Sequence, residues 1–147
     1  MSARFSTGLR IYLQVTGSIR QALANSELRI YSGPVPASVD SAISVSNELL
    51  CTIRTSVGGG LNLGTDAPGG LLLKDATEVW QGEVITGGTA TFYRHVLPSD
   101  TDTASEAAIR IQGTVGIAGQ NMIISNPLLV EGAIQRLESY VISLPEA

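Results

Sequence analysis

Cysteine is almost absent from the chain, which has one in 147 residues, so an intrachain disulfide is impossible. Cys51 lies in the apolar run from Leu49 to Ile53, a setting that favours a small buried side chain over a reactive thiol. A chain of this length can bury a sizeable core without covalent cross-links. The lack of disulfides is typical of a protein that folds in a reducing cytoplasm.

Lys and Arg are also scarce, since nine of them against thirteen Asp and Glu give a formal net charge of −4. Nucleic-acid binding needs clustered basic side chains that displace counterions from phosphates. Only seven residues are aromatic, and none of them is interleaved with a basic stripe. We therefore expect no nucleic-acid partner.

Long apolar runs are missing, because no stretch approaches the roughly 18 apolar residues of a membrane-spanning helix. We expect no secretory signal either, since the N-terminus lacks an apolar segment followed by a small-residue cleavage site. Charged residues make up 15% of the chain, and its mean hydropathy is positive. This composition predicts no membrane partner, and a lightly charged surface that is partly covered by other subunits.

Groups that carry catalysis are equally few. His95 is the only histidine, so a metal site would have neither a second histidine nor a second cysteine. A serine paired with His95 would lack the Gly-x-Ser-x-Gly elbow. The glycines at 58–60 and at 113–119 lack the strand-to-helix setting that binds phosphates or dinucleotides. We therefore expect no enzyme, and no catalytic, cofactor-binding or metal-binding residues.

One acidic segment leaves a calcium site open. Asp100, Asp102 and Glu106 could supply carboxylate ligands, and carboxylate oxygens are what Ca²⁺ prefers. Their spacing is not that of an EF-hand loop, and a solvated acidic loop is the commoner structure.

Carbohydrate chemistry also stays open. Trp80, Tyr93 and Tyr140 could form a sugar-binding face, although a tryptophan in the middle of a strand is more often part of the core. Two distant carboxylates could serve a glycosidase, which one sequence does not exclude.

The first 25 residues differ from the rest, because Arg4, Arg10 and Arg20 make them basic beside an acidic body. The segment 16–25 predicts a short helix with Ser18 as its N-cap. The segment 5–13 predicts either a further helical turn or an arm that orders against a neighbour. We expect residues 1–25 to form an N-terminal arm with a short helix, and residues 26–147 to form the main domain.

The main domain has the texture of a β protein, with short β-branched and apolar runs between clusters of Gly, Pro, Asn and Ser. In residues 107–115, for example, Ile109 and Ile111 alternate with Arg110 and Gln112. In residues 48–55 the same alternation predicts that Leu50 and Cys51 face opposite ways. A helical turn is expected at 37–42. The expected strands cover residues 28–32, 48–55, 78–85, 89–97, 107–115, 122–125 and 132–144. This pattern predicts an all-β fold, an antiparallel β-sandwich or jelly roll with a short N-terminal helical arm.

Several motifs occur in an order that resembles a known group of proteins. They are the run IYSG-x-x-P at 30–36, Trp80-x-Gly82, Gly-Thr-Ala at 88–90 with an aromatic–Arg pair at 93–94, and Gly-Thr-Val-Gly at 113–116. With the opening MSARFSTGLR, this order resembles small structural proteins of tailed bacteriophages, and the match covers most of the chain. The run RIYLQV at 10–15 is more apolar than the resemblance leads us to expect.

The resemblance implies a virion component that is made in the bacterial host cytoplasm and brings no catalytic residues with it. Its partners would be copies of itself, in a homo-oligomer, and other capsid, neck or tail subunits. We expect the basic segment 1–25 to dock the protein onto the particle. The expected location is the head–neck region, as a collar or connector component, or the capsid surface, as a decoration protein. The alternative is a tail-associated or lectin-like module that recognises a host-surface glycan.

Overall fold

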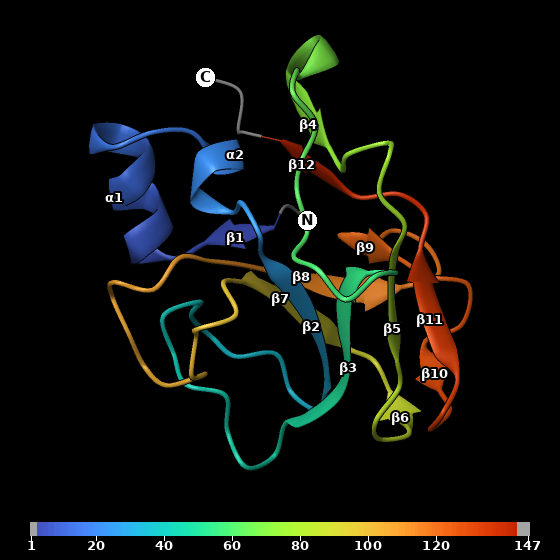
Figure 1. The fold of residues 1–147 in the computed structure, drawn as a ribbon. Helices are drawn as coiled ribbons and strands as arrows, with labels where there is room; N and C mark the ends of the chain where they lie inside the picture. Colours follow the sequence, from blue (N-terminus) through green and yellow to red (C-terminus); the bar gives the residue numbers. More distant parts are fainter. Residues whose placement is uncertain (1–2, 144–147) are drawn as a thin grey trace.

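Short strands are the main regular structure in residues 3–143, the part of the chain that the computed structural model describes (Figure 1). In the first half the elements are β1 (Arg4–Phe5), α1 (Thr7–Val15), α2 (Ile19–Ala22), β2 (Glu27–Ser32), β3 (Glu48–Thr55), a 3₁₀ turn (Pro68–Gly70) and β4 (Leu71–Leu73). In the second half they are β5 (Trp80–Glu83), β6 (Gly88–Thr89), β7 (Phe92–Val96), β8 (Arg110–Gly116), β9 (Met122–Ile123), β10 (Leu128–Leu129), β11 (Ile134–Leu137) and β12 (Val141–Ser143).

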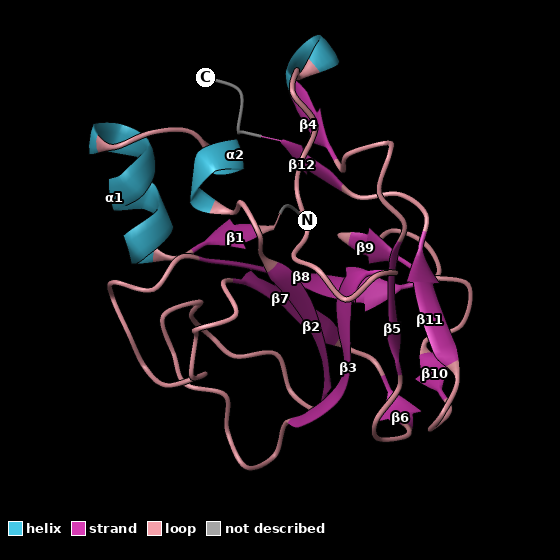
Figure 2. Cartoon of the chain, viewed as in Figure 1, coloured by secondary structure: helices cyan, strands magenta, loops and turns pink. Residues whose placement is uncertain are grey.

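The main sheet has the strand order β1-β8-β7-β2-β3-β5-β11, and neighbouring strands along this path are antiparallel. Strand β9 adds a short parallel pairing to β8. Two small ribbons, β6 with β10 and β4 with β12, complete the strands of the described residues. Figure 2 shows that helix is confined to the N-terminal segment and one turn near β4. The all-β, antiparallel and sandwich-like prediction is therefore confirmed.

Side chains alternate between two buried faces of the central strands. In β2, Leu28 and Ile30 enter the apolar core, whereas Arg29 points to the opposite face. In β8, Ile111 lies in the core and Arg110 lies on the opposite face, as the alternation predicted. The central strands β2 and β8 therefore have one apolar face and one charged face, and both are covered.

The N-terminal segment packs onto the same core as the sheet. Strand β1 pairs with β8, and Ser6 caps α1 by accepting a hydrogen bond from the Leu9 N–H. Leu9 and Leu23 are fully buried. The predicted helix after residue 16 is present as α2, and Ser18 and Gln21 form a capping box at its start. Whether residues 1–25 also dock the protein onto a particle stays a prediction.

Three local expectations were wrong. The segment 37–42 is irregular rather than helical, and Asp40 instead accepts hydrogen bonds from the N–H and Oγ1 of Thr7. The expected strand 89–97 is divided into β6 and β7, because Ala90 donates to the Pro127 carbonyl before β7 begins. The expected strand 132–144 is divided into β11 and β12, and residue 144 lies outside the described residues.

A register shift and a close backbone contact explain the burial of Leu50 and Cys51 and the need for glycine at position 82. The register shifts between Ile30 and Tyr31 of β2, so Leu50 and Cys51 of β3 are both buried instead of facing opposite ways. A side chain at Gly82 of β5 would collide with the Thr52 carbonyl of β3. The glycine of the Trp-x-Gly motif is therefore required by the approach of β3 to β5.

Candidate functional site

The only histidine lies in a buried hydrogen-bonded chain. His95 Nε2 is 2.6 Å from Ser26 Oγ, and His95 Nδ1 is 3.0 Å from the Tyr140 hydroxyl. Burial lowers the pKa of His95 to about 3, so the imidazole is neutral near pH 7. None of the three side chains is accessible to a substrate, because all are at most 3% exposed. This arrangement satisfies polar groups inside the core.

The three aromatic residues considered for sugar binding form an internal cluster. The Tyr140 ring lies 5.5 Å from Trp80 and 5.9 Å from Tyr93, measured between ring centroids. All three residues are buried. A sugar stacks on an exposed aromatic face, so this burial argues against the glycan-binding surface. It also agrees with the interpretation of Trp80 as a core residue.

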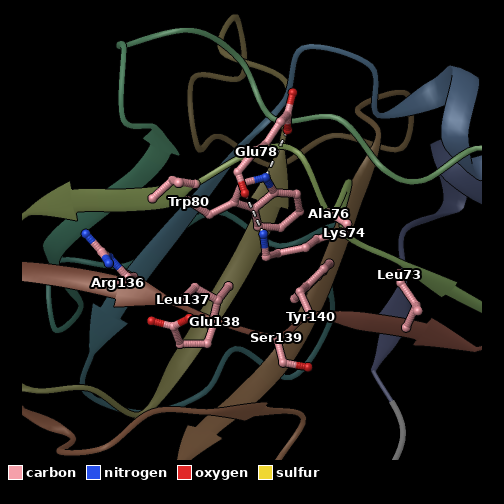
Figure 3. Close-up of a pocket in the computed structure, with 11 residues that line it drawn as sticks. Leu73, Lys74, Ala76, Glu78, Trp80, Arg136, Leu137, Glu138, Ser139 and Tyr140 are labelled. Carbon is pink, nitrogen blue, oxygen red and sulfur yellow. Dashed lines mark hydrogen bonds between the residues drawn. The ribbon is translucent and has the colours of Figure 1, made fainter.

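A hollow of about 440 Å³ lies beside this cluster, between the β4–β5 segment and the chain that links β11 to β12. Figure 3 shows Lys74 and Trp80 both directed at Glu78. Lys74 Nζ donates to the Glu78 carbonyl at 2.6 Å, and Trp80 Nε1 donates to Glu78 Oε1 at 2.9 Å. The donors that line the hollow are thus engaged by the protein itself, which favours a structural role.

The charged face of the sheet holds ion pairs beneath two loops. Arg110 makes a bidentate contact with Asp100, with Nε–Oδ2 at 2.7 Å and Nη2–Oδ1 at 2.9 Å. Arg29 Nε lies 2.7 Å from Glu27 Oε2, and Arg29 Nη1 lies 3.1 Å from Asp102 Oδ1. Both arginines also donate to backbone carbonyls in the loops at 33–47 and 97–109. The ion pairs therefore hold these loops against the sheet.

The acidic loop is not the solvated segment that the sequence indicated. The Asp100 side chain is only 4% exposed. Burial alone would raise the pKa of Asp100, but hydrogen bonds from Arg110 and the Asp102 N–H hold it below its ordinary value. Among residues 3–143, no group of three His, Cys, Asp or Glu is placed to hold a metal ion. Because arginines occupy the carboxylates of Asp100 and Asp102, the structure argues against the calcium site.

Arg94 is the exception on this face. It is fully buried, its Nε donates to Gln112 Oε1 at 2.9 Å, and its Nη1 has no hydrogen-bond partner among the described residues. Burial and the nearby Arg110 guanidinium lower the pKa of Arg94. Burial of a cation without an ion-pair partner costs desolvation energy, which its hydrogen bonds to Gln112 Oε1 and the Ser38 carbonyl offset in part.

The surface is unusually rich in large apolar side chains. In the described part of the chain, those that are exposed are Ile11, Val15, Val35, Val45, Val57, Leu71, Leu73, Val79, Ile85, Ile117, Ile123, Leu128, Val130, Ile134 and Val141. Several of them belong to the short strands β4, β9, β10, β11 and β12. Of these strands β11 is the edge of the main sheet, β9 pairs with β8, and β4, β10 and β12 belong to the two small ribbons. Exposed Ile123, Ile134 and Val141 lie together beside the edge strand, and contiguous apolar surface marks contact sites, so we regard this surface as the candidate functional surface.

The edge strand β11 borders a groove of about 650 Å³. The groove is lined by residues from the β9 segment on one side and from β11 to β12 on the other, with exposed Ile123, Ile134 and Val141 among them. Sequence reasoning did not single out this groove. Its only signal was the light charge of the chain, which does not locate a surface.

Comparisons with protein-family models, with curated proteins and with solved structures find no match for this chain. Among the described residues, no helix has the length and apolar character needed to cross a membrane.

Proposed function

We propose that this protein is a structural component of a tailed-bacteriophage virion, an oligomeric accessory protein of the head–neck region or of the capsid surface. The observation that carries the assembly role is the apolar surface beside β11, the open edge strand of the main sheet, where Ile123, Ile134 and Val141 are exposed. Such surfaces are stable in water when other subunits cover them. The bacteriophage assignment rests on the resemblance of the sequence motifs.

The polar and aromatic groups of the interior support this proposal, because they contact one another inside the protein. The serine–histidine pair and the aromatic cluster are buried, and the carboxylates of Asp100 and Asp102 are paired with arginines. The groups that could serve catalysis or ligand binding are thus committed to holding the fold. A protein of this kind stabilises an assembly by contact, with copies of itself and other virion subunits as partners.

Immunogold electron microscopy tests the proposal directly. Antibodies against the purified protein are applied to purified particles produced by the genome that encodes the chain, with particles from a genome lacking the gene as the control. We expect label at the head–neck junction or over the capsid surface. Label confined to the tail would favour the tail-associated alternative, and unlabelled particles with the protein only in the lysate would overturn the virion assignment.

The proposed docking of residues 1–25 onto the particle is not tested cleanly by deleting this segment. Deletion would remove β1 together with the buried Leu9 and Leu23, so the body itself would be damaged. Arg4, Arg10 and Arg20 are exposed, and replacing all three by serine changes the charge while leaving the core intact. We expect this variant to unfold at an unchanged temperature and to lose occupancy on particles. Normal occupancy would contradict the docking role.

A further inference from the structure

We propose that the free edge of β11 pairs in antiparallel fashion with β11 of a second copy of this chain. In the resulting two-fold dimer, Arg136 lies opposite Glu138 of the partner subunit. The inference rests on the proposed function, because it names the copy-to-copy contact of the assembly. It follows from the hydrogen-bonding pattern of β11, from the charges along it, and from the apolar groove beside it.

Within residues 3–143, no strand pairs with one side of β11. Val84 N–H donates to the Ala133 carbonyl, so the alternation of an antiparallel ladder directs Gln135 and Leu137 toward Gly82 and Trp80 of β5. Ile134 and Arg136 then direct their N–H and C=O groups away from β5, and Glu138 directly follows the last residue of the strand. The Arg136 carbonyl accepts a hydrogen bond from the side-chain Nε2 of Gln135 at 2.8 Å, and an incoming strand would replace this local bond. An exposed edge of this kind is a template for another strand.

The opposite edge of the sheet offers much less to a partner. Strand β1 has only two residues, and α1 follows it at that end of the molecule (Figure 1). A head-to-tail contact between β11 of one copy and β1 of the next would therefore be very short. Strand β11, by contrast, has four residues. Pairing of β11 with itself makes the longer ladder.

The charges along β11 select one register for this pairing. With the two-fold axis at Leu137, Arg136 faces Glu138 of the partner subunit, and the symmetry repeats the pair. With the axis at Arg136, two arginines would instead lie directly opposite one another. Opposite charges across a ladder stabilise it and like charges destabilise it. Arg136 and Glu138 are both exposed on the same side of the strand, so the first register is favoured.

The groove beside β11 supplies the apolar part of the interface. Ile123 is 50% exposed, Ile134 is 59% exposed and Val141 is 42% exposed, and all three line the groove. A strand seated against β11 would lie along this groove and cover them. An isologous contact of this type has a two-fold axis, whereas a ring needs head-to-tail contacts. Of the two proposed locations, it therefore favours the capsid surface over the neck.

Charge exchange at the edge tests this register. The dissociation constant of the full chain is measured by sedimentation equilibrium for the wild type, Arg136→Glu, Glu138→Arg and the double variant. We expect a wild-type dimer, single variants at least about tenfold weaker because like charges now face each other, and a double variant within about threefold of the wild type. The matched controls Arg20→Glu and Glu106→Arg make the same changes in net charge at exposed sites away from β11 and should stay within about threefold.

A backbone variant tests the edge independently of charge. Arg136→Pro removes an N–H that points away from β5, so it should abolish pairing while the monomer keeps its thermal unfolding temperature. A wild-type monomer at every concentration, a ring, a double variant as weak as the single ones, or a proline variant that still dimerises would overturn the inference. Particle labelling is a separate measurement. Labelled particles together with any of these results would leave the virion assignment standing and remove only the β11 contact.

Discussion

Strands β2, β7 and β8 bury both of their faces, but with side chains of opposite kinds. One face presents Leu28 and Ile111 to an apolar core, and the other presents Arg29, Arg94 and Arg110 to two irregular loops. The apolar face is stabilised by the removal of surface from water, a force without direction. The charged face depends on carboxylates and carbonyls placed at hydrogen-bonding distance.

This difference explains why the loops at 33–47 and 97–109 can lie closed over the sheet. A loop has few apolar side chains to bury, but each of its residues carries a backbone carbonyl. Arg110 donates to the carbonyls of Val39, Asp40, Ser41 and Thr103. Arginine, with five N–H donors, can thus anchor both loops to one strand.

Removing Arg110 should have the largest effect. Arg110→Met leaves the buried Asp100 carboxylate without its bidentate partner, and we expect a loss of about 3–5 kcal/mol in the free energy of unfolding. Ile111→Val, one residue along β8 on the apolar face, should cost about 0.5–1.5 kcal/mol. Urea unfolding at pH 7 measures both variants. If Arg110→Met cost less than Ile111→Val, the charged face would not hold the loops as described.

As the pH falls, protonation linked to His95 on the apolar face should lower the free energy of unfolding before the carboxylates of the charged face titrate. The pKa of His95 is lowered from its ordinary value of 6.5 to about 3 by burial, so the unfolded chain binds a proton that the folded chain does not. Stability is full above pH 6.5 and falls as the pH drops toward 3, by about 2 kcal/mol between pH 6.5 and 4.5. This window lies above the ordinary pKa of carboxylic acids, so Asp100 contributes little to it.

The His95→Gln variant tests whether His95 causes this loss of stability in acid. Its amide can hydrogen-bond to Ser26 and Tyr140 but does not titrate. The variant should be less stable than the wild type at pH 7 and should show a flat dependence on pH between 6.5 and 4.5. Urea unfolding across that range measures both slopes. An unchanged slope in the variant would place the titrating group elsewhere.

The sequence predicts the charged face and the apolar face of the sheet to different extents. Alternation along residues 107–115 was enough to separate Ile111 from Arg110, because the period of a strand is local. It gave no sign that Arg110 is buried, since a charged side chain on a strand is usually exposed. Its acceptors lie outside the strand: Asp100 is 10 residues away and the Val39 carbonyl is 71 residues away. The burial of Asp100, which was predicted in a solvated loop, likewise has no local signal in the sequence.

The apolar face has one local signal that worked and one that failed. Trp80 was predicted as a core residue from its place in a strand, and it is fully buried. Leu50 and Cys51 were expected on opposite sides of β3, but a register shift against β2 buries both. A bulge depends on the partner strand, so the sequence of β3 alone does not reveal it. The open edge of β11 likewise follows from strand order, which no single segment encodes.

Arg94 tests whether charge on this face stabilises by itself. It lies between Arg29 and Gln112 in the strand register and makes no ion pair within 4 Å with any residue of the described part of the chain. Arg94→Met removes a buried unpaired cation but leaves Gln112 Oε1 without its donor, so we expect a net change within about 1 kcal/mol. Urea unfolding beside Arg110→Met gives the comparison. A loss of 3 kcal/mol or more, on the order expected for a broken buried pair, would contradict the description of Arg94 as unpaired.

Arg54 should give the smallest effect, although its ion pair is among the shortest on this face. Its Nη2 lies 2.6 Å from Glu27 Oε1, but its side chain is 49% exposed, and Glu27 keeps a second partner in Arg29. We expect Arg54→Ala to cost at most about 1 kcal/mol and to lose most of that difference in concentrated salt. Urea unfolding in low and high salt measures it. Arg54 and Arg110 each pair with a buried carboxylate at nearly the same distance, so a large gap between them isolates burial of the cation as the source of stability. Equal losses in the free energy of unfolding would mean that the distance between the charges sets the stability of an ion pair. Burial of the cation would then not explain why the charged face is stable.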